Sequence, residues 1–409
     1  MALIRTVLVV SLLVASGALP TGTAAATTQQ SEAYAGTHIE FETTSDAIAN
    51  YSVNGNTVFE SMEVQSRSGA ESRGDVQAGV GLSAVTSITG AALSLESQTE
   101  AEASATVTAE SGATMEAHDN SRGILVVRSD GESQYVTVNV SGSAETESES
   151  DQRVVVTNEN GAEGTFIVVG DGEVTINDQG NVSANLESNG KLVFRSYSDG
   201  RNEDDERKEQ LISEGKAAAE VYVMQESEQG GELAADVVEY GEGTTVEVTQ
   251  QTEGTVQMTA DRSQQEGKII ITSVSEQAIS SVEDLQVTVD GEAAAEASSY
   301  SDLEGAIGSD TSKFLVRQQS SAQASADVLV AVNQFSTREI TMSEDSSDSE
   351  DSDGSGSDST DSSDEEMTAT DEDRGTTATN GPGFGPVVAL SALVAVAVLA
   401  LARRRSSKH

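Results

Sequence analysis

The 409-residue chain contains no cysteine and no tryptophan, and aromatic residues make up 3% of it. Without cysteine it can form no disulfide, no thiolate nucleophile and no cysteine-ligated metal site. Its stability must therefore come from its core, from salt or from bound ions. The scarcity of aromatic side chains weighs against a surface that binds sugars or bases by stacking.

Basic residues are also scarce, because 22 Lys and Arg stand against 69 Asp and Glu, for a formal net charge of −47. Such a chain repels nucleic acids, which excludes DNA or RNA as partners. At about 1 M salt the Debye length falls to about 3 Å and repulsion between surface charges largely vanishes. The composition therefore indicates a halophilic protein. Intrinsic disorder, the other reading of a high net charge, conflicts with the strand pattern described below.

Residues 1–26 have the features of a cleaved signal peptide. Arg5 supplies the positive start, and an apolar run extends from Val7 to Val14. Gly17 and Pro20 then break the helix, and Ala24-Ala25-Ala26 offers a small-residue cleavage site. An uncleaved membrane anchor is disfavoured, because the apolar run is too short to span a bilayer.

Residues 343–380 are predicted to form a disordered, acidic Ser/Asp/Glu stalk. Between Ser343 and Arg374 there are 14 acidic residues and one basic residue, and Met367 is the one sizeable apolar side chain. This segment cannot bury a core and its charges repel one another, so we expect an extended, solvated chain. Residues 376–380 continue it as a Thr-rich spacer.

Residues 381–409 combine a Gly/Pro-rich turn, an apolar stretch and a basic cluster. Residues 386–402 are predicted to form a transmembrane helix at the short end of the usual range. Arg403, Arg404 and Arg405 belong on the cytoplasmic side by the positive-inside rule, which places the rest of the chain outside. The signal peptide and the tail therefore predict the same topology.

The order of Pro382-Gly383-Phe384, apolar helix and Arg403–Arg405 resembles the PGF-CTERM sorting signal of archaeal surface proteins. The resemblance implies that a membrane-embedded archaeosortase recognises the tripeptide and removes the apolar tail, and that an archaeal membrane lipid then holds the mature chain. The logic parallels that of the glycolipid-anchor signal. A plain transmembrane anchor behind a Gly/Pro turn is the alternative. The resemblance says nothing about the ectodomain.

The ectodomain, residues 27–342, is predicted to be mainly β, with antiparallel sheets in a sandwich or an elongated meander and a possible sub-boundary near residue 120. Apolar and polar residues alternate in segments such as 136–140 and 246–248. Hairpin-type dipeptides separate such segments at 54–55, 130–131, 171–172, 189–190 and 290–291. The clearest predicted hairpin joins residues 166–169 to residues 173–176.

Four short strands begin alike, at 123–128, 190–195, 267–272 and 312–317. Each is followed by a polar insertion and a second strand, at 135–140, 217–224, 285–289 and 327–332. Since the apolar runs are continuous, we expect these strands to be central and covered on both faces. The Ala-, Ser- and Thr-rich segment 76–115 is predicted to be either a flat strand ladder or a flexible segment.

One helix is predicted, with Asn202 as its N-cap, four acidic residues in its first turn and Gly215 at its end. Having few large apolar residues, it is expected to lie on the surface. The carboxylates of Asp199, Glu203, Asp204 and Asp205 are weak candidates for a calcium site. A solvated turn at the start of a helix is the favoured interpretation, because the stretch departs from the EF-hand pattern.

The sequence offers little for catalysis and predicts no enzyme and no cofactor. Within the ectodomain only His38 and His118 are histidines, and no familiar nucleophile, zinc or phosphate-binding motif occurs. Three sequons make Asn50, Asn139 and Asn181 possible N-glycosylation sites. Period-2 alternation predicts that Asn139 faces away from its neighbouring valines.

These features predict an exported protein held at the outer face of a halophilic archaeal cell membrane. Its expected partners are an archaeosortase-type processing enzyme and the membrane. For the ectodomain we expect a non-enzymatic role in envelope structure, such as an S-layer, or in adhesion or interaction. Binding of a lipid, solute or ion is the alternative, and a hydrolase is a third possibility. The sequence does not identify a partner of the ectodomain.

Overall fold

The computed structural model describes residues 32–344, except 78, 100–103, 141, 226–232 and 319–325. All the described residues lie in one compact unit that ends at Ser347. The predicted signal peptide and sorting tail, and all but the first two residues of the predicted stalk, lie outside the described residues. Within the described part, no helix is long and apolar enough to cross a bilayer.

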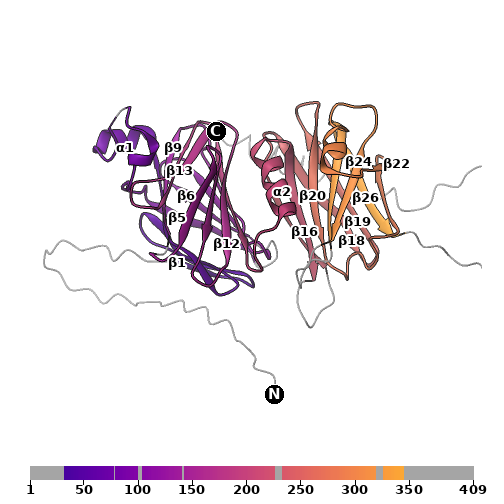
Figure 1. Ribbon diagram of the computed structural model, residues 1–409, viewed down its shortest axis with the longest axis horizontal. Helices are drawn as coiled ribbons and strands as arrows, with labels where there is room; N and C mark the ends of the chain where they lie inside the picture. Colours follow the sequence, from indigo (N-terminus) through magenta and orange to yellow (C-terminus); the bar gives the residue numbers. More distant parts are fainter. Residues whose placement is uncertain are drawn as a thin grey trace, which may run out of the picture. The chain divides into compact units, whose positions relative to one another are not determined.

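The first half of the described chain forms a sandwich of two antiparallel sheets, which we call sheets A and B (Figure 1). In spatial order, sheet A contains β1 (Glu32–Ala35), β2 (Ile39–Thr43), β3 (Ala47–Val53), β4 (Asn56–Ser66), β9 (Gln134–Val140), β14 (Val182–Leu186) and β13 (Gly172–Ile176). Sheet B contains β10 (Glu145–Ser150), β11 (Arg153–Thr157), β12 (Glu163–Val169), β15 (Lys191–Tyr197), β8 (Leu125–Arg128), β7 (Thr114–His118), β6 (Ser104–Ala109) and β5 (Leu93–Thr99).

The second half forms another sandwich, made of sheets C and D. Sheet C contains β17 (Leu233–Glu239), β16 (Ala217–Gln225), β20 (Glu266–Val274), β25 (Ala326–Gln334), β24 (Lys313–Gln318) and β23 (Ala295–Glu296). Sheet D contains β18 (Thr244–Thr252), β19 (Thr255–Arg262), β26 (Arg338–Glu344), β21 (Leu285–Val289) and β22 (Glu292–Ala293). The prediction of a mainly β fold with antiparallel sheets is confirmed, with two parallel pairs added, β16 with β20 and β23 with β24.

Three apolar layers hold the four sheets together. One core fills the space between sheets A and B, and a second fills the space between sheets C and D. A third cluster joins sheet B to sheet C, because alternate residues of their central strands point the other way. In β15, for example, Leu192 and Phe194 belong to the first core and Val193 to the third cluster. We call this contact between the two sandwiches the junction.

The four similar strands predicted from the sequence fall in the two sheets that meet at the junction. They are β8 and β15, neighbours in sheet B, and β20 and β24 in sheet C. Each buries side chains on both faces, as the continuous apolar runs predict. The second strands that follow them differ in their position. β25 pairs with β24 in the same sheet, in antiparallel orientation. By contrast, β9 and β21 lie in the opposite sheet from β8 and β20, the strands that precede them.

Turn dipeptides mark hairpins in some places and changes of sheet in others. Asn54-Gly55 and Asp290-Gly291 have positive φ at both residues and close hairpins, as predicted. The predicted hairpin of residues 166–176 is wrong, because β12 pairs with β11 and β15 while β13 pairs with β14. The turn at Gly170–Gly172 carries the chain from sheet B to sheet A. A tight turn fixes a change of direction, not a pairing partner.

Helix α2 (Glu203–Ser213) has the predicted limits, with a capping box between Asn202 and Asp205 and Gly215 at positive φ behind it. The expectation that it lies on the surface is wrong. Leu211 and Ile212 are buried in the junction, and α2 contacts both β12 and β16 (Figure 1). Three charged residues of the helix, Asp205, Lys208 and Glu209, are buried with them. They make buried ion pairs, which a search for large apolar residues does not detect.

The remaining helices are short. Helix α1 (Arg67–Arg73) and the 3-10 turn η1 (Leu82–Ala84) close a small satellite cluster over Tyr135, and α3 (Tyr300–Glu304) lies against β24 and β25. Segment 76–115 divides into this irregular part and the ladder of β5, β6 and β7. No break falls near residue 120, because β7 and β8 are neighbours in sheet B. The chain instead changes sandwich between β15 and β16.

Candidate functional site

The junction gathers buried charged groups from both sandwiches. Arg195, within β15, donates to Glu220 of β16 at 2.9 Å, and both side chains are 1% exposed. The Tyr240 hydroxyl donates to the other oxygen of Glu220 at 2.7 Å. Burial alone lowers the pKa of Arg195, but the Glu220 carboxylate raises it well above its usual value. Arg195 therefore keeps its charge inside an apolar layer.

A second buried chain of charges passes through helix α2. Asp205 is bonded to Arg122 at 3.0 Å and to Lys208 at 2.9 Å. Lys208 also reaches Asp327 of β25 at 2.6 Å, and the Ser273 hydroxyl donates to the same carboxylate. Although burial raises the pKa of Asp327, the charge of Lys208 holds it below its usual value. This network ties sheet B, helix α2 and sheet C together.

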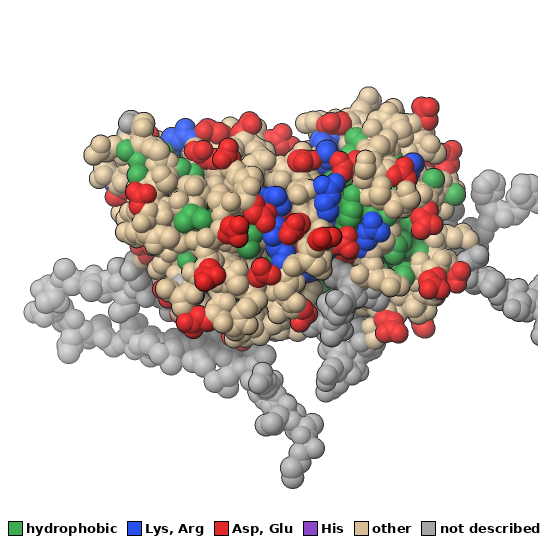
Figure 2. Space-filling view, viewed as in Figure 1, with side chains coloured by type: hydrophobic (Ala, Val, Ile, Leu, Met, Phe, Trp, Pro, Cys, Tyr) green, Lys and Arg blue, Asp and Glu red, His purple; other side chains and the backbone are tan. Residues whose placement is uncertain are grey.

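A third group of contacts surrounds Glu209 of α2, whose side chain is fully buried. It accepts hydrogen bonds from Tyr197 at 2.6 Å, from Arg201 at 2.6 and 2.9 Å and from Arg153 at 3.4 Å. Arg201 also makes a bidentate ion pair with Glu149 of β10. On the face seen in Figure 2, Lys and Arg side chains gather in a band with carboxylates among them. Several of the protein's few basic residues, among them Arg195, Arg201 and Lys208, are thus buried at the junction.

The segment His118-Asp119-Asn120 makes hydrogen bonds to both sandwiches. His118 Nδ1 and Asn120 Nδ2 both bond to the carboxylate of Asp236 in β17, at 2.8 and 2.7 Å. Asp119 points the other way and accepts three backbone N–H groups of residues 37–39, at 2.6 to 2.9 Å. A Cβ at Gly36 would lie 2.1 Å from the Asp119 carboxylate, so this close approach requires glycine.

The His118–Asp236 pair predicts a pH-dependent stability. Burial lowers the pKa of His118, but Asp236 outweighs it, so that the pKa is raised above the usual value of 6.5. The stabilisation is therefore fully present below about pH 6.5 and is lost as pH rises through the raised pKa. We expect the free energy of unfolding, measured with urea at constant molar salt, to fall over that interval by at most about 1.4 kcal/mol per pH unit.

His118→Asn keeps a donor near Asp236 but removes the titration, so it is expected to flatten the pH profile. His38→Asn is the matched control, because the side chain of His38, just before β2, hydrogen-bonds to Asn54 and not to Asp236. A wild-type profile that stays flat between pH 6 and 8.5, or one that His118→Asn leaves unchanged, contradicts the assignment.

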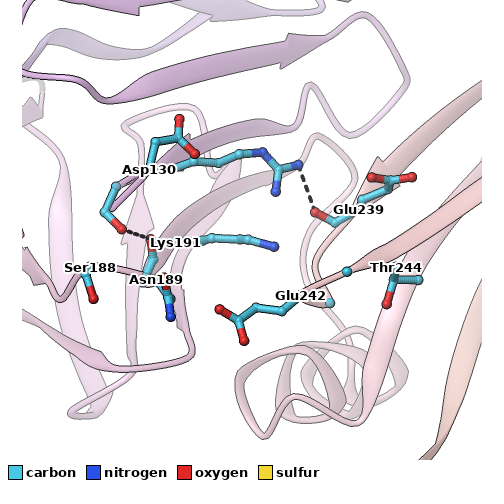
Figure 3. A pocket seen from close by; sticks show the side chains of 12 residues that line it. Asp130, Ser188, Asn189, Lys191, Glu239, Glu242 and Thr244 are labelled. Atoms are coloured by element: carbon cyan, nitrogen blue, oxygen red, sulfur yellow. Dashed lines mark hydrogen bonds between the residues drawn. The ribbon is translucent and has the colours of Figure 1, made fainter. Parts of the chain in front are cut away.

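A pocket of about 310 Å³ opens at the edge of the junction (Figure 3). It is lined by three connections, 128–130, 188–191 and 239–244, and no lining side chain is apolar. Arg128 donates to Glu116 at 2.8 and 2.9 Å and to the Glu239 carbonyl at 3.0 Å, which closes one wall. The Ser129 hydroxyl donates to the Gly190 carbonyl at 2.9 Å. The pocket therefore suits a polar ligand.

Lys191 is the buried cation of this pocket, with 8% of its surface exposed. Its Nζ donates to the Tyr240 carbonyl across the junction. Burial lowers its pKa to about 8, and Arg128 pushes in the same direction. Glu239, Glu242 and Glu116 oppose this shift without reversing it. At neutral pH the group is a charged ammonium that deprotonates more readily than an ordinary lysine.

The structure separates the candidate calcium ligands. Asp205 turns inward to Arg122 and Lys208, Asp204 bonds to Arg317 at 3.3 Å, and Asp199 and Glu203 are exposed. Nowhere in the described ranges do three or more His, Asp or Glu side chains group as a metal site. The calcium hypothesis gains no support from this arrangement. Its favoured alternative, a turn leading into a capped helix, is what the structure contains.

The sequon asparagines differ in exposure. Asn50 and Asn139 are exposed, and Asn139 faces away from the buried Val138 and Val140, as predicted. Asn181 is half-buried, and its side-chain oxygen accepts the Val140 N–H at 3.2 Å. Asn50 and Asn139 are thus accessible to a glycan, and glycosylation stays a prediction. The sorting residues Pro382, Gly383, Phe384 and Arg403–Arg405 lie outside the described residues.

Sequence reasoning missed the junction and the pocket. A signal was present, because Arg128 and Arg195 directly follow two of the continuous apolar runs. A charged residue in a strand covered on both faces must find a buried partner. The partners themselves could not be named, because Glu116 and Glu220 stand among 69 acidic residues. Only the fold distinguishes them from the solvated ones.

A family model described as the PGF-CTERM motif matches residues 381–405. The match is consistent with an archaeosortase-processed surface protein and supports surface exposure and membrane anchoring. No curated protein matches the chain. Among solved structures, a polysaccharide lyase shows 8% sequence identity and a TM-score of 0.14 over 61% of this chain. The match spans 34% of the lyase's length, and a likeness this slight carries no argument.

Proposed function

We propose that the protein is a non-enzymatic component of the envelope of a halophilic archaeal cell, in which two β-sandwiches act as one rigid body at the outer face of the membrane. In this proposal the acidic segment 345–380, which follows the end of β26 at Glu344, raises the sandwiches above the bilayer. A structural or adhesive role requires a body that holds its shape outside the cell. The sorting motif supplies the location, and the junction supplies the rigidity.

The junction is the observation that carries the proposal. Contacts between domains of one chain usually permit motion unless they are large and apolar. Here an apolar cluster that includes Ile124, Val193, Ile269 and Leu329 fills the contact, and buried ion pairs cross it. Opening the contact would leave charges such as Arg195 and Glu220 without their partners in a partly dry layer, which costs several kcal/mol. Bending between the sandwiches is therefore strongly resisted.

Two alternatives receive less support. A lipid-binding role needs an apolar cavity, whereas the side chains around the 310 Å³ pocket are polar or glycine. A hydrolase needs a converging acid or histidine cluster. The two ectodomain histidines do not converge in this way, because His118 hydrogen-bonds to Asp236 and His38 to Asn54. A role in binding a polar solute is supported by Lys191, a buried lysine in a pocket without apolar side chains.

If the sorting signal anchors the protein at the membrane, changes to its tripeptide and to its apolar stretch should have different outcomes. Replacing Pro382, Gly383 and Phe384 by Ala should leave export intact and block processing, so that a longer, helix-anchored form accumulates in the membrane. Deleting residues 387–401 should instead release the protein to the medium, because nothing then holds it in the bilayer. Intact-mass measurement of surface and medium fractions distinguishes these outcomes.

Substitution of Thr376, Thr377 and Thr379 by Ala is the matched control, since it alters three nearby spacer residues outside the motif. It is expected to leave processing unchanged. In the wild type, the mature protein is expected to lack residues 403–409 and to carry a lipid. If the surface-resident protein still ends at His409, the predicted processing does not occur and the tail is a plain transmembrane anchor.

A further inference from the structure

Lys191 differs from every other lysine in the described ranges. Each of the others lies within 4 Å of at least one carboxylate: Lys208 with Asp205 and Asp327, Lys216 with Glu214 and Glu304, Lys268 with Glu266, and Lys313 with Asp302. Within the same residues, Lys191 makes no such ion pair, and its one hydrogen bond is to a backbone carbonyl. In a chain with 69 acidic residues, this separation is a specific feature of the fold.

The surroundings of Lys191 make the missing partner costly. The residue is 8% exposed, so most of its side chain is removed from bulk water and its ammonium faces the pocket (Figure 3). An ammonium has three donors, and the Tyr240 carbonyl takes one of them. A buried cation is normally neutralised by a partner or loses its proton more readily, and the pKa of Lys191 is indeed lowered to about 8. The unused donors have room for an acceptor from outside the chain.

The acidic groups around the pocket form no ion pair with Lys191, because they accept hydrogen bonds from other residues or face solvent. Glu116 accepts both bonds from Arg128, and Glu239 accepts the Val246 N–H at 3.0 Å. Asp130 and Glu242 are exposed. Figure 3 shows the Lys191 side chain extending into the open space bordered by Glu239 and Glu242. The cation therefore lies on the inner side of the pocket, and free carboxylates lie toward solvent.

We propose that this pocket binds a small ligand with a single oxyanion group, for which Lys191 is the counter-charge. The volume, about 310 Å³, equals roughly ten water molecules at their share of liquid volume, so the ligand is small. The lining is free of apolar side chains, so the rest of the ligand is polar. Asp130 and Glu242 near the opening repel a second negative group, which favours a monocarboxylate over a polyanion.

The test uses the full-length chain, purified in detergent at molar sodium chloride. A water-soluble acylating reagent labels lysines, and peptide mass mapping reads each site separately. Sodium acetate replaces chloride stepwise at constant ionic strength, with sulfate and inorganic phosphate as parallel series. Acetate is expected to slow labelling of Lys191 with a saturable dependence, while Lys216 in the same sample is unaffected, since it is already paired with Glu214 and Glu304.

Variants measured by thermal unfolding complete the test, because a ligand that binds the folded state raises the melting temperature. Lys191→Gln should weaken acetate binding by on the order of tenfold or more, the loss expected for a hydrogen bond to a charged group. Lys191→Arg, which keeps the charge, should retain most of the binding. Lys216→Gln is the matched control and should behave as the wild type.

Three results overturn the proposal. One is labelling of Lys191 that depends on ionic strength alone, with acetate and chloride equivalent. Another is an acetate effect that Lys191→Gln leaves intact. The third is stronger protection by sulfate or phosphate than by acetate, which shows a polyanion site instead. None of these outcomes bears on the sorting motif or on the junction, so the proposed envelope function is tested separately.

Discussion

The full-length protein is expected to lose most of its strand signal in circular dichroism when it is moved from molar sodium chloride into dilute buffer. The formal charge of −47 opposes compaction, and its repulsion is screened over about 3 Å at 1 M salt but over about 30 Å at 0.01 M. The junction strengthens this expectation. Basic side chains such as Arg195, Arg201 and Lys208 are buried there and leave the outer surface with few counter-charges.

The salt series should reverse on return to molar salt and should be alike for sodium and potassium chloride, since screening depends on ionic strength. The double variant Glu145→Gln and Glu147→Gln, on the exposed edge strand β10, should shift the transition to lower salt because it removes two unpaired surface charges. Glu149→Gln should not shift the transition to lower salt, because that carboxylate pairs with Arg201 and Arg153. Full strand content at low salt, without added calcium, contradicts the expectation.

Removing one partner of the Arg195–Glu220 pair is expected to be the most destabilising single change at the junction. Glu220→Gln keeps the shape of the side chain but leaves a fully buried guanidinium without its counter-charge, which costs about 3–5 kcal/mol. Urea unfolding at constant molar salt measures this loss. Salt does not rescue it, because buried pairs are screened much less than exposed ones.

Two comparisons make this result specific. Glu266→Gln removes a partner of Lys268 from a pair whose carboxylate is 63% exposed, and about 0–1 kcal/mol is expected there. The double variant Arg195→Met with Glu220→Leu replaces the buried pair by apolar side chains and should recover most of the stability. If Glu220→Gln is as mild as Glu266→Gln, the junction does not depend on its ion pairs, and the argument for a rigid two-sandwich body fails.

Several elements of the fold were predictable because their determinants are local. The Asn54-Gly55 hairpin follows from two residues that tolerate positive φ, and the limits of α2 follow from the Asn202 cap and Gly215. Continuous apolar runs correctly predicted strands covered on both faces, because burial on two sides removes the alternation. The exposure of Asn139 follows from the period of a strand in the same way.

Pairing partners were not local and were predicted less well. The turn at Gly170–Gly172 is equally compatible with a hairpin and with a step from sheet B to sheet A, and only the positions of β14 and β15 decide between them. The burial of α2 was missed for a related reason. Its inward face carries Asp205, Lys208 and Glu209, whose partners Arg122, Asp327 and Arg153 come from distant parts of the chain.

The sequence by itself carries the sorting motif, which supports anchoring at a membrane surface, and the acidic composition from which a saline medium is predicted. The sorting motif is a short linear signal read by an enzyme, and net charge is a sum over residues, so neither depends on the fold. Only the tertiary structure decided which charges matter. It selected Glu220, Asp236 and Glu209 from 69 acidic residues to meet the buried basic groups. It also left Lys191 facing a pocket without an acidic partner, because burial and distance, which set the energy of a charge, exist only once the chain has folded.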